Sequence, residues 1–276
     1  MKKILYKILI ILIIILLLLI YSRFFGTIGL KTKEIPIKTE SIKESYDGLK
    51  IIHFCDLHYK KVITNNRVKN IISEINILKP DIAIFTGDLL DKDYHLDNKS
   101  TNFLIKELSK IKSTYGNYAI IGDNDKDLDS LKNIYIQSNF KLLNNEETII
   151  YNNQNDKISI IGLNSLAYNK KNINNLINNS KEDTYKIVLI HEPDYINDLI
   201  KHNNINLILS GHSINGSINI PIIKNILLPK GAKKYYKPYY NKNNIDIYIS
   251  NGIGVNNINF RLFNHPSINF YRILTK

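Results

Sequence analysis

The chain has 276 residues, of which 44% are hydrophobic, so it is long enough for a membrane segment followed by one domain with a full core. Its single cysteine, Cys55, excludes an intramolecular disulfide framework and a cysteine-based zinc cluster, and we interpret it as a small buried hydrophobe. The formal charge of +12 suits nucleic acid, an anionic membrane face or a phosphorylated substrate, and it does not choose among these partners.

The first 25 residues predict a membrane anchor. Residues 4–21 are apolar except for Lys7, and a helix of this length spans roughly 27 Å, close to the ~30 Å hydrocarbon core of a bilayer. A cleaved signal peptide is the competing interpretation, but the residues after the apolar run offer no convincing small-residue cleavage site. We therefore expect residues 1–25 to form an uncleaved, single-pass transmembrane helix.

Basic residues flank both ends of this predicted helix and nearly balance each other. They are Lys2, Lys3 and Lys7 on one side and Arg23, Lys31 and Lys33 on the other. Lys and Arg favour the cytoplasmic side of a membrane. We expect the N-terminus to lie inside and the domain that follows the helix to be extracytoplasmic.

Residues 26–46 are mostly polar and are interpreted as a linker that passes into an edge strand. Apolar side chains alternate at residues 35–37, and the proline between them is tolerated in a strand at the edge of a sheet. The main domain is expected to occupy residues 47–276.

The domain sequence alternates between strand-like and helix-like patterns. Apolar runs of the length of buried strands occupy residues 49–54, 82–85, 118–121, 158–161, 187–190, 207–209, 245–249 and 268–274. Apolar residues between 68 and 78, and between 103 and 111, are spaced for one face of a helix. This alternation predicts an α/β sandwich.

Possible metal ligands follow five of these apolar runs. In chain order they are Asp56 and His58, then Gly87-Asp88, then residues 122–125, then His191, then Gly211-His212. Ligands bind outside the carboxyl ends of strands in open α/β sheets, so these residues could converge in one crevice. Carboxylates and imidazoles without thiolates suit one or two divalent ions such as manganese, iron or zinc.

Each of these elements alone is a weak signal, but their order resembles the signature of the calcineurin-like metallophosphoesterase superfamily. That signature reads D-x-H, G-D, G-N-H-D/E, H and G-H-x-H. The likeness is to the membrane-associated, single-domain bacterial branch, and it extends to residues 48–58, 79–88, 191–193, 250–254 and 261–264. It implies a two-sheet β-sandwich flanked by helices, the metallophosphoesterase fold.

The resemblance also implies roles for individual residues. Asp56 and His58 would hold a first metal ion, Asp88 would bridge two ions, and Asp123, His191 and His212 would hold the second. The implied activity is that of a metal-dependent phosphoric ester hydrolase, in which a metal-bound hydroxide attacks a phosphomonoester, phosphodiester or diphosphate. A membrane-derived, lipid-linked substrate such as a phospholipid or a nucleotide-linked lipid diphosphate suits an anchored enzyme.

Three positions depart from the signature. Asp123 replaces the usual asparagine, Asn124 stands where the family places a histidine at the catalytic site, and Ile214 replaces the second histidine of G-H-x-H. Asn124 cannot donate a proton at useful pH, and a missing general acid typically costs ~10²–10⁴ in rate. Ile214 cannot coordinate, so the first ion is expected to bind weakly unless water or Asn215 supplies an oxygen. The alternative function is a catalytically degenerate, membrane-tethered binding module.

Residues 230–242 interleave lysines with tyrosines, which could stack on and pair with nucleic acid. Attraction to anionic lipid head groups or to a phosphate-bearing substrate is favoured over nucleic acid because the chain is predicted to be tethered to a membrane. A solvated, partly packed loop is the purely structural alternative. His53, His202 and His265 lie outside the motif, and His53 is interpreted as a sheet-packing residue.

Overall fold

The computed structural model describes the chain except for residues 1, 166–168, 181–183, 221–222 and 256–258. Its strands are β1 (Lys31–Thr39), β2 (Leu49–Phe54), β3 (Ile82–Phe85), β4 (Asn117–Ala119), β5 (Phe140–Leu142), β6 (Glu146–Tyr151), β7 (Lys157–Gly162), β8 (Tyr185–Ile190), β9 (Leu207–Ser210), β10 (Tyr239–Lys242), β11 (Ile245–Ile249) and β12 (Ser267–Thr275). The α-helices are α1 (Lys2–Ile20), α2 (Asn65–Ile77), α3 (Asn98–Leu108), α4 (Leu128–Gln137), α5 (Lys170–Asn179), α6 (Ile196–Leu199) and α7 (Ile223–Leu227). Short helical turns are η1 (Tyr21–Phe25), η2 (Glu44–Tyr46) and η4 (Pro193–Tyr195).

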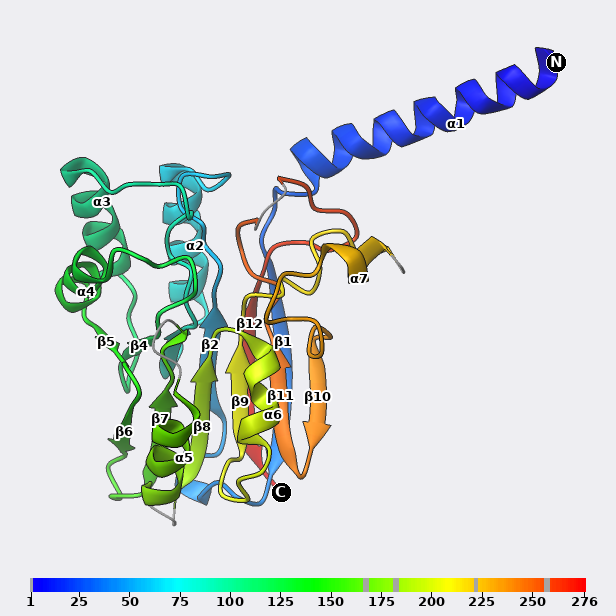
Figure 1. Ribbon diagram of the computed structural model, residues 1–276. Coiled ribbons are helices and arrows are strands. Elements are labelled where there is room, and N and C mark those ends of the chain that lie inside the picture. The colour runs from blue at the N-terminus through cyan, green and yellow to red at the C-terminus, as the bar shows by residue number, and fades with distance from the viewer. Residues whose placement is uncertain (1, 166–168, 181–183, 221–222, 256–258) are drawn as a thin grey trace.

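These strands form two six-stranded mixed sheets (Figure 1). The strand order is β1-β12-β2-β3-β4-β5 in the first sheet and β10-β11-β9-β8-β7-β6 in the second. Strands β2 to β5 are parallel to one another, as are β7, β8, β9 and β11. The two-sheet sandwich expected from the sequence is confirmed.

Alternation along β2 shows how the layers are assembled. Ile51 packs in the cluster between the sheets, together with Ile187 and Leu209 of the second sheet. Its neighbour Ile52 points to the opposite face, as successive side chains of a strand must, and packs in the cluster that contains Ile72 of α2. Because strands at the centre of each sheet are covered on both faces, their sequences are continuous apolar runs.

Helices cover the outer face of each sheet. The predicted stripe of α2 is buried, with Val68, Ile71, Ile72 and Ile75 facing the first sheet, and the Thr64 side chain caps the helix by accepting from the Arg67 amide. The same outer core contains residues of α3 and α4, whereas the second sheet is covered by residues of α5 and α6.

Helix α1 and the π-helical turn η1 form one apolar rod that projects from the domain (Figure 1). Residues Lys2–Phe25 form the one helix in the described chain that is long and apolar enough to cross a membrane, and none of α1 is buried. The base of the rod contacts the domain closely. The Arg261 amide donates to the Ser22 carbonyl at 3.0 Å, and Gly26 lies so close to the Arg261 carbonyl that a Cβ at Gly26 would overlap it.

Candidate metal centre

The loops that follow β2, β3, β4, β8 and β9 carry the side chains expected to bind metal. Four of these residues have left-handed backbones, with φ of 51° at Asp56, 44° at His58, 59° at Asp88 and 60° at His212. Few non-glycine residues adopt such a conformation, and it is concentrated at functional sites. The tight turns bring all six predicted ligands into two groups that share Asp88.

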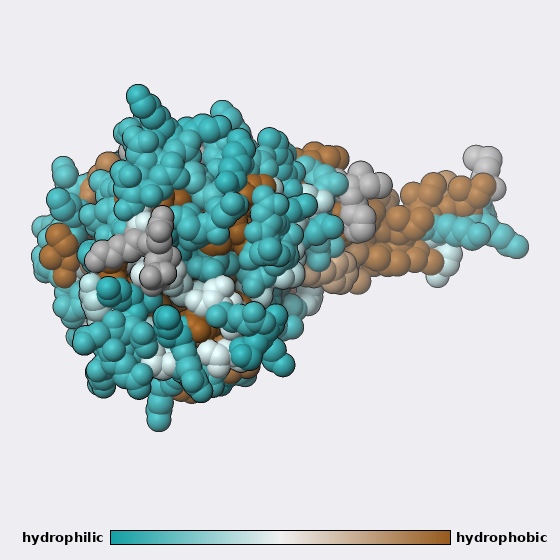
Figure 2. Space-filling model, turned by 90° about the horizontal axis from the view of Figure 1, so that it is seen from below, coloured by the Kyte–Doolittle hydropathy of each residue, from teal (hydrophilic) through white to brown (hydrophobic). Residues whose placement is uncertain are grey.

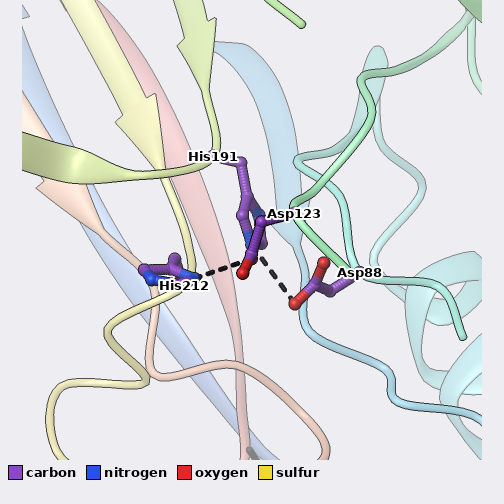
Figure 3. A group of neighbouring side chains, drawn as sticks. All are labelled: Asp88, Asp123, His191 and His212. Atoms are coloured by element: carbon purple, nitrogen blue, oxygen red, sulfur yellow. Dashed lines mark ion pairs between the residues drawn. The ribbon is translucent and has the colours of Figure 1, made fainter. Parts of the chain in front are cut away.

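The first group, called here the four-residue group, consists of Asp88, Asp123, His191 and His212, with ligand atoms within 4.8 Å of one another (Figure 3). His191 Nε2 lies 3.3 Å from Asp88 Oδ2 and 3.2 Å from Asp123 Oδ1. His212 Nδ1 lies 3.0 Å from Asp123 Oδ1. The Asp123 carboxylate therefore points toward both imidazoles.

Backbone carbonyls orient both imidazoles of this group. His191 Nδ1 donates to the Thr86 carbonyl at 2.6 Å, and His212 Nε2 donates to the Lys230 carbonyl at 2.7 Å. A proton fixed on one ring nitrogen leaves the other free to bind a metal, the usual arrangement around a metal-ligating histidine. The free nitrogens, His191 Nε2 and His212 Nδ1, are buried and make no hydrogen bond of good geometry among the described residues.

The charges of the four-residue group fit a cation. Burial opposes the charged form of the His191 imidazole, but the Asp88 and Asp123 carboxylates outweigh burial and raise the pKa of His191 well above its usual value. Burial also opposes charge on Asp123, yet the close approach of the His191 and His212 imidazoles holds the pKa of Asp123 well below its usual value. The buried Asp88 carboxylate, the partly exposed Asp123 carboxylate and the two imidazole nitrogens without hydrogen bonds fit the oxygen and nitrogen donor set of a divalent metal site.

The second group, called here the three-residue group, consists of Asp56, His58 and Asp88, again within 4.8 Å. His58 Nε2 lies 3.6 Å from Asp88 Oδ2 and 3.9 Å from Asp56 Oδ1. Both ring nitrogens of His58 are buried without a hydrogen bond among the described residues, so this ring also fits a metal ligand. The three-residue group supplies one ligand fewer than the four-residue group.

Ile214 stands two residues after His212, at the position of the second histidine in the G-H-x-H signature that the sequence resembles. Its side chain is 1% exposed and its φ is 46°, an outlying conformation for a β-branched residue. The Asn264 side chain holds the loop in place by donating to the carbonyls of Ile214 and Gly216. The adjacent Asn215 donates to Asn251, and its Oδ1 is buried without a hydrogen-bond partner in the described structure.

Asn124 contacts the bridging carboxylate directly. Its amide nitrogen donates to Asp88 Oδ1 at 3.0 Å, and its side-chain Nδ2 donates to Asp88 Oδ2 at 2.6 Å. The residue at the position of the family's catalytic-site histidine therefore fixes the orientation of Asp88. Both donors are amide groups, and neither is acidic enough to give a proton to a leaving oxygen.

Asp125 is a positioning residue that the sequence did not reveal as such. Its buried carboxylate accepts hydrogen bonds from the amides of Asp88, Leu89 and Gly122, which joins the loops after β3 and β4. Burial, followed by the neighbouring Asp88 carboxylate, raises the pKa of Asp125 to about 7. The one indication of this role in the sequence was the position of Asp125 at the end of the G-D-N-D motif.

Arg261 has a comparable role on the other side of the centre. It is fully buried and donates to the carbonyls of Asn251, Gly252 and Gly254. Gly252 packs against Asp56 of the three-residue group, because a Cβ at Gly252 would lie 2.9 Å from the Asp56 Cβ. Burial lowers the pKa of Arg261 to about 9. One arginine thus fixes the loop behind Asp56 and also contacts Ser22 at the base of the apolar rod.

Two structural interpretations from the sequence are confirmed. Cys55 is fully buried, and its thiol donates to Asp56 Oδ2 at 2.6 Å. His53 is buried in the sheet between Thr86 and Tyr271, where burial lowers its pKa to about 3 and keeps the ring neutral. Residues 230–238 form a loop, and Tyr239–Lys242 at the end of the lysine- and tyrosine-rich stretch pair as β10 with β11.

Known proteins share this sequence pattern and architecture. The metallophosphoesterase YkuE of Bacillus subtilis is 27% identical over 92% of this chain and 88% of its own length. YkoQ from the same organism is 28% identical over 92% of this chain and 96% of its own. A transmembrane protein with a metallophosphoesterase domain from Danio rerio is 22% identical over 68% of this chain and 45% of that protein.

Among solved structures, the sulfate thiohydrolase SoxB of Thermus thermophilus superposes with a TM-score of 0.52 at 9% identity. The superposition covers 83% of this chain and 57% of SoxB, and it shows the fold alone. Residues 49–215, well over half of the sequence, match the family described as calcineurin-like phosphoesterase. With the shared-carboxylate geometry described above, this match shows that the chain belongs to the calcineurin-like phosphoesterase family.

Proposed function

We propose that the protein is a membrane-anchored, metal-dependent phosphoesterase that hydrolyses a phosphomonoester, phosphodiester or diphosphate of a membrane-derived substrate. The observation that carries this proposal is the pair of ligand groups that meet at Asp88. Asp56, His58, Asp88, Asp123, His191 and His212 would hold one or two ions of manganese, iron or zinc. Such ions activate water and neutralise charge on the phosphoryl oxygens.

The protein's own residues set the geometry for this reaction. Asn124 and Asp125 fix Asp88 from two sides, through the carboxylate and through its amide. The carbonyls of Thr86 and Lys230 fix the two imidazoles. Since Asn124 has no acidic proton, the leaving oxygen must take its proton from solvent, and well-activated leaving groups should be the best substrates.

A groove beside His212 supports a lipid-linked phosphate as the substrate. This groove has a volume of about 400 Å³ and is lined by Ser213, Ile226, Leu227, Leu228, Lys230 and Lys233, among others. Apolar walls suit hydrocarbon, and the two lysines suit an anionic group. Ser213 directly follows the predicted ligand His212, and the Lys230 carbonyl accepts from His212 Nε2, so the groove borders the loop that carries this residue.

The proposed function can be tested with the full chain in nanodiscs. Hydrolysis of p-nitrophenyl phosphodiesters would be measured with and without manganese, with bound metal counted by mass spectrometry. Asp88→Asn should abolish the manganese-dependent turnover because it removes the shared ligand. Asp93→Asn, which changes an exposed carboxylate on the same loop, is the matched control and should keep it. Turnover that survives Asp88→Asn would contradict the assignment.

The second candidate function is the degenerate binding module, favoured by Asn124 and by the buried, non-coordinating Ile214. It predicts a folded protein that binds one ion or none and turns over neither aryl nor lipid phosphodiesters. Its biological role should then survive Asp88→Asn.

The proposed topology is a single-pass anchor with an extracytoplasmic catalytic domain, and a cleaved signal sequence is the alternative. Protease added to intact cells would distinguish the two sides of the membrane. The mass of the purified protein would show whether residues 1–25 are retained.

A further inference from the structure

Three chain segments meet where the apolar rod joins the domain. The turn η1 contacts Arg261 through Ser22, and the next residue, Leu262, donates to Ser217 at 2.9 Å. Asn219 in turn donates to Leu262 at 2.9 Å, and α7 begins only a few residues later. The base of the rod, the loop at 261–263 and the segment that leads into α7 therefore lie next to one another at this end of the domain (Figure 1).

This surface exposes large apolar side chains. Ile226 of α7 is 73% exposed and Phe263 is 67% exposed, and Phe24, Phe25 and Ile28 at the base of the rod are also exposed. We call these five residues the docking surface. A contiguous exposed apolar patch on a soluble domain marks a site of contact with a protein or a membrane.

The same end of the molecule is strongly basic. Neither aspartate nor glutamate occurs among residues 20–33, 199–245 or 247–276, which include every segment of the docking surface. Contacts hold the lysine-rich stretch against α7: Lys224 Nζ lies 5.1 Å from the centre of the Tyr236 ring, and Lys233 Nζ donates to the Asn225 carbonyl. Apolar side chains bordered by lysines are typical of surfaces that bind anionic lipid.

The opposite end of the domain has a different character. Figure 2 views the molecule from that end, and the visible face of the domain is mainly hydrophilic, in contrast to the hydrophobic rod. One end is thus apolar and basic and is joined to a candidate transmembrane helix, whereas the other is suited to water. Continuity with the rod favours a lipid bilayer, rather than a second protein, as the partner of the docking surface.

We propose that the docking surface inserts into the anionic head-group layer of the membrane in which α1 is anchored. This inference rests on the membrane anchoring put forward under the proposed function. Arg261 contacts the base of the rod and also fixes the loop behind Asp56, so docking places the metal centre next to the lipid surface. The groove beside His212 then opens toward lipid, and a phosphorylated lipid can enter it without leaving the bilayer.

The chain contains no tryptophan, so single tryptophans can serve as depth probes. The full chain would be reconstituted in nanodiscs of phosphatidylglycerol with and without bromine on the acyl chains. Phe263→Trp tests the docking surface, and Ile226→Trp repeats the test at a second site. Tyr151→Trp at the end of β6 is the matched control at another exposed aromatic, and Ile14→Trp in α1 reports the anchor.

The proposal predicts that brominated lipid removes most of the tryptophan emission at positions 263, 226 and 14 and leaves the emission at position 151 unchanged. Nanodiscs of zwitterionic lipid should show clearly weaker quenching at positions 263 and 226. Quenching at position 14 without quenching at 263 and 226 would overturn docking while the anchor stands. A lack of quenching at all positions would overturn both the docking and the membrane anchor. The phosphoesterase activity is tested separately, by turnover of the soluble aryl substrate. Equal quenching at positions 151 and 263, or in both lipids, would also overturn the proposal.

Discussion

The two ligand groups of the metal centre share Asp88 but differ in completeness. The four-residue group has two carboxylates and two imidazoles, each imidazole oriented by a backbone carbonyl. The three-residue group has only Asp56 and His58 besides the shared carboxylate, and the His58 ring makes no hydrogen bond among the described residues. The difference arises on a single loop, at Ile214.

The loop at Ile214 shows that the backbone conformation of a loop and the metal-binding ability of its side chains can differ. Ile214 keeps a left-handed backbone that is costly for a β-branched residue, and Asn264 holds its carbonyl as though the loop still presented a ligand. The Ile214 side chain cannot coordinate a metal, whatever conformation the backbone of the loop adopts. The number of ligands has to be established residue by residue, because the fold alone does not fix it.

The largest expected effect comes from removing a ligand of the four-residue group. His191→Ala should lower manganese-dependent kcat on an aryl phosphodiester by about 10³-fold, since an ion supplies several kcal/mol of charge stabilisation. His58→Ala is the matched change in the three-residue group and should cost less, because its ion is expected to bind weakly already. Equal losses in the two variants would show that the two groups are equivalent.

The next largest effect concerns the missing proton donor. Asn124→His should raise kcat/KM for alkyl phosphodiesters by about 10²-fold, because a general acid can then protonate the poor leaving oxygen. Aryl substrates should gain little. Asn124→Gln keeps the amide and serves as the control. A gain of the same size for both substrate classes would point to a change in metal binding instead of acid catalysis.

Ile214→His should restore a ligand to the three-residue group. We expect the affinity for the weaker manganese ion to rise by about 10- to 100-fold, which can be measured by calorimetric titration of the metal-free protein. Histidine also tolerates a left-handed backbone better than isoleucine, so the variant should fold normally. Ile214→Leu, which cannot coordinate, should leave the titration unchanged. An unaltered titration in Ile214→His would mean that the loop no longer points toward Asp56 and His58.

The smallest expected effect comes from changing Asp91, which supports His58. The Asp91 carboxylate lies 4.0 Å from His58 Nδ1 and pairs with Lys61 at 3.1 Å. Asp91→Asn should weaken the metal affinity of the three-residue group by about 10-fold, as a supporting partner of a ligand does, and should leave the four-residue group unaffected. Metal titration of both sites provides the measurement, and a loss confined to the four-residue group would contradict it.

The sequence predicted the strands near the centre of the sheets and the convergence of six side chains. Residues 49–54, 82–85 and 245–249 match β2, β3 and β11 residue for residue, because buried strands are uninterrupted apolar runs. The same argument placed the candidate ligands at the ends of these strands. Their binding of metal stays a prediction.

Features that depend on distant contacts were not predicted. Five of the ten residues of helix α5 are asparagine, a weak helix former, and the helix buries Ile173 and Ile177, so tertiary packing and not propensity decides its conformation. Asp125 acts through amides 36 and 37 residues away, and Arg261 acts through the carbonyls of another loop. Such hydrogen bonds leave no periodic pattern in the sequence.

The pairing of β1 constrains when the domain can fold. β1 follows the apolar rod directly, yet it pairs in parallel with β12, with Lys31 opposite Ser267, and β12 separates it from β2. During synthesis the rod can enter the membrane long before residue 267 leaves the ribosome. Contacts between residues so distant in sequence form slowly. We therefore expect β1 to remain unpaired beside the bilayer until β12 has been synthesised and pairs with it.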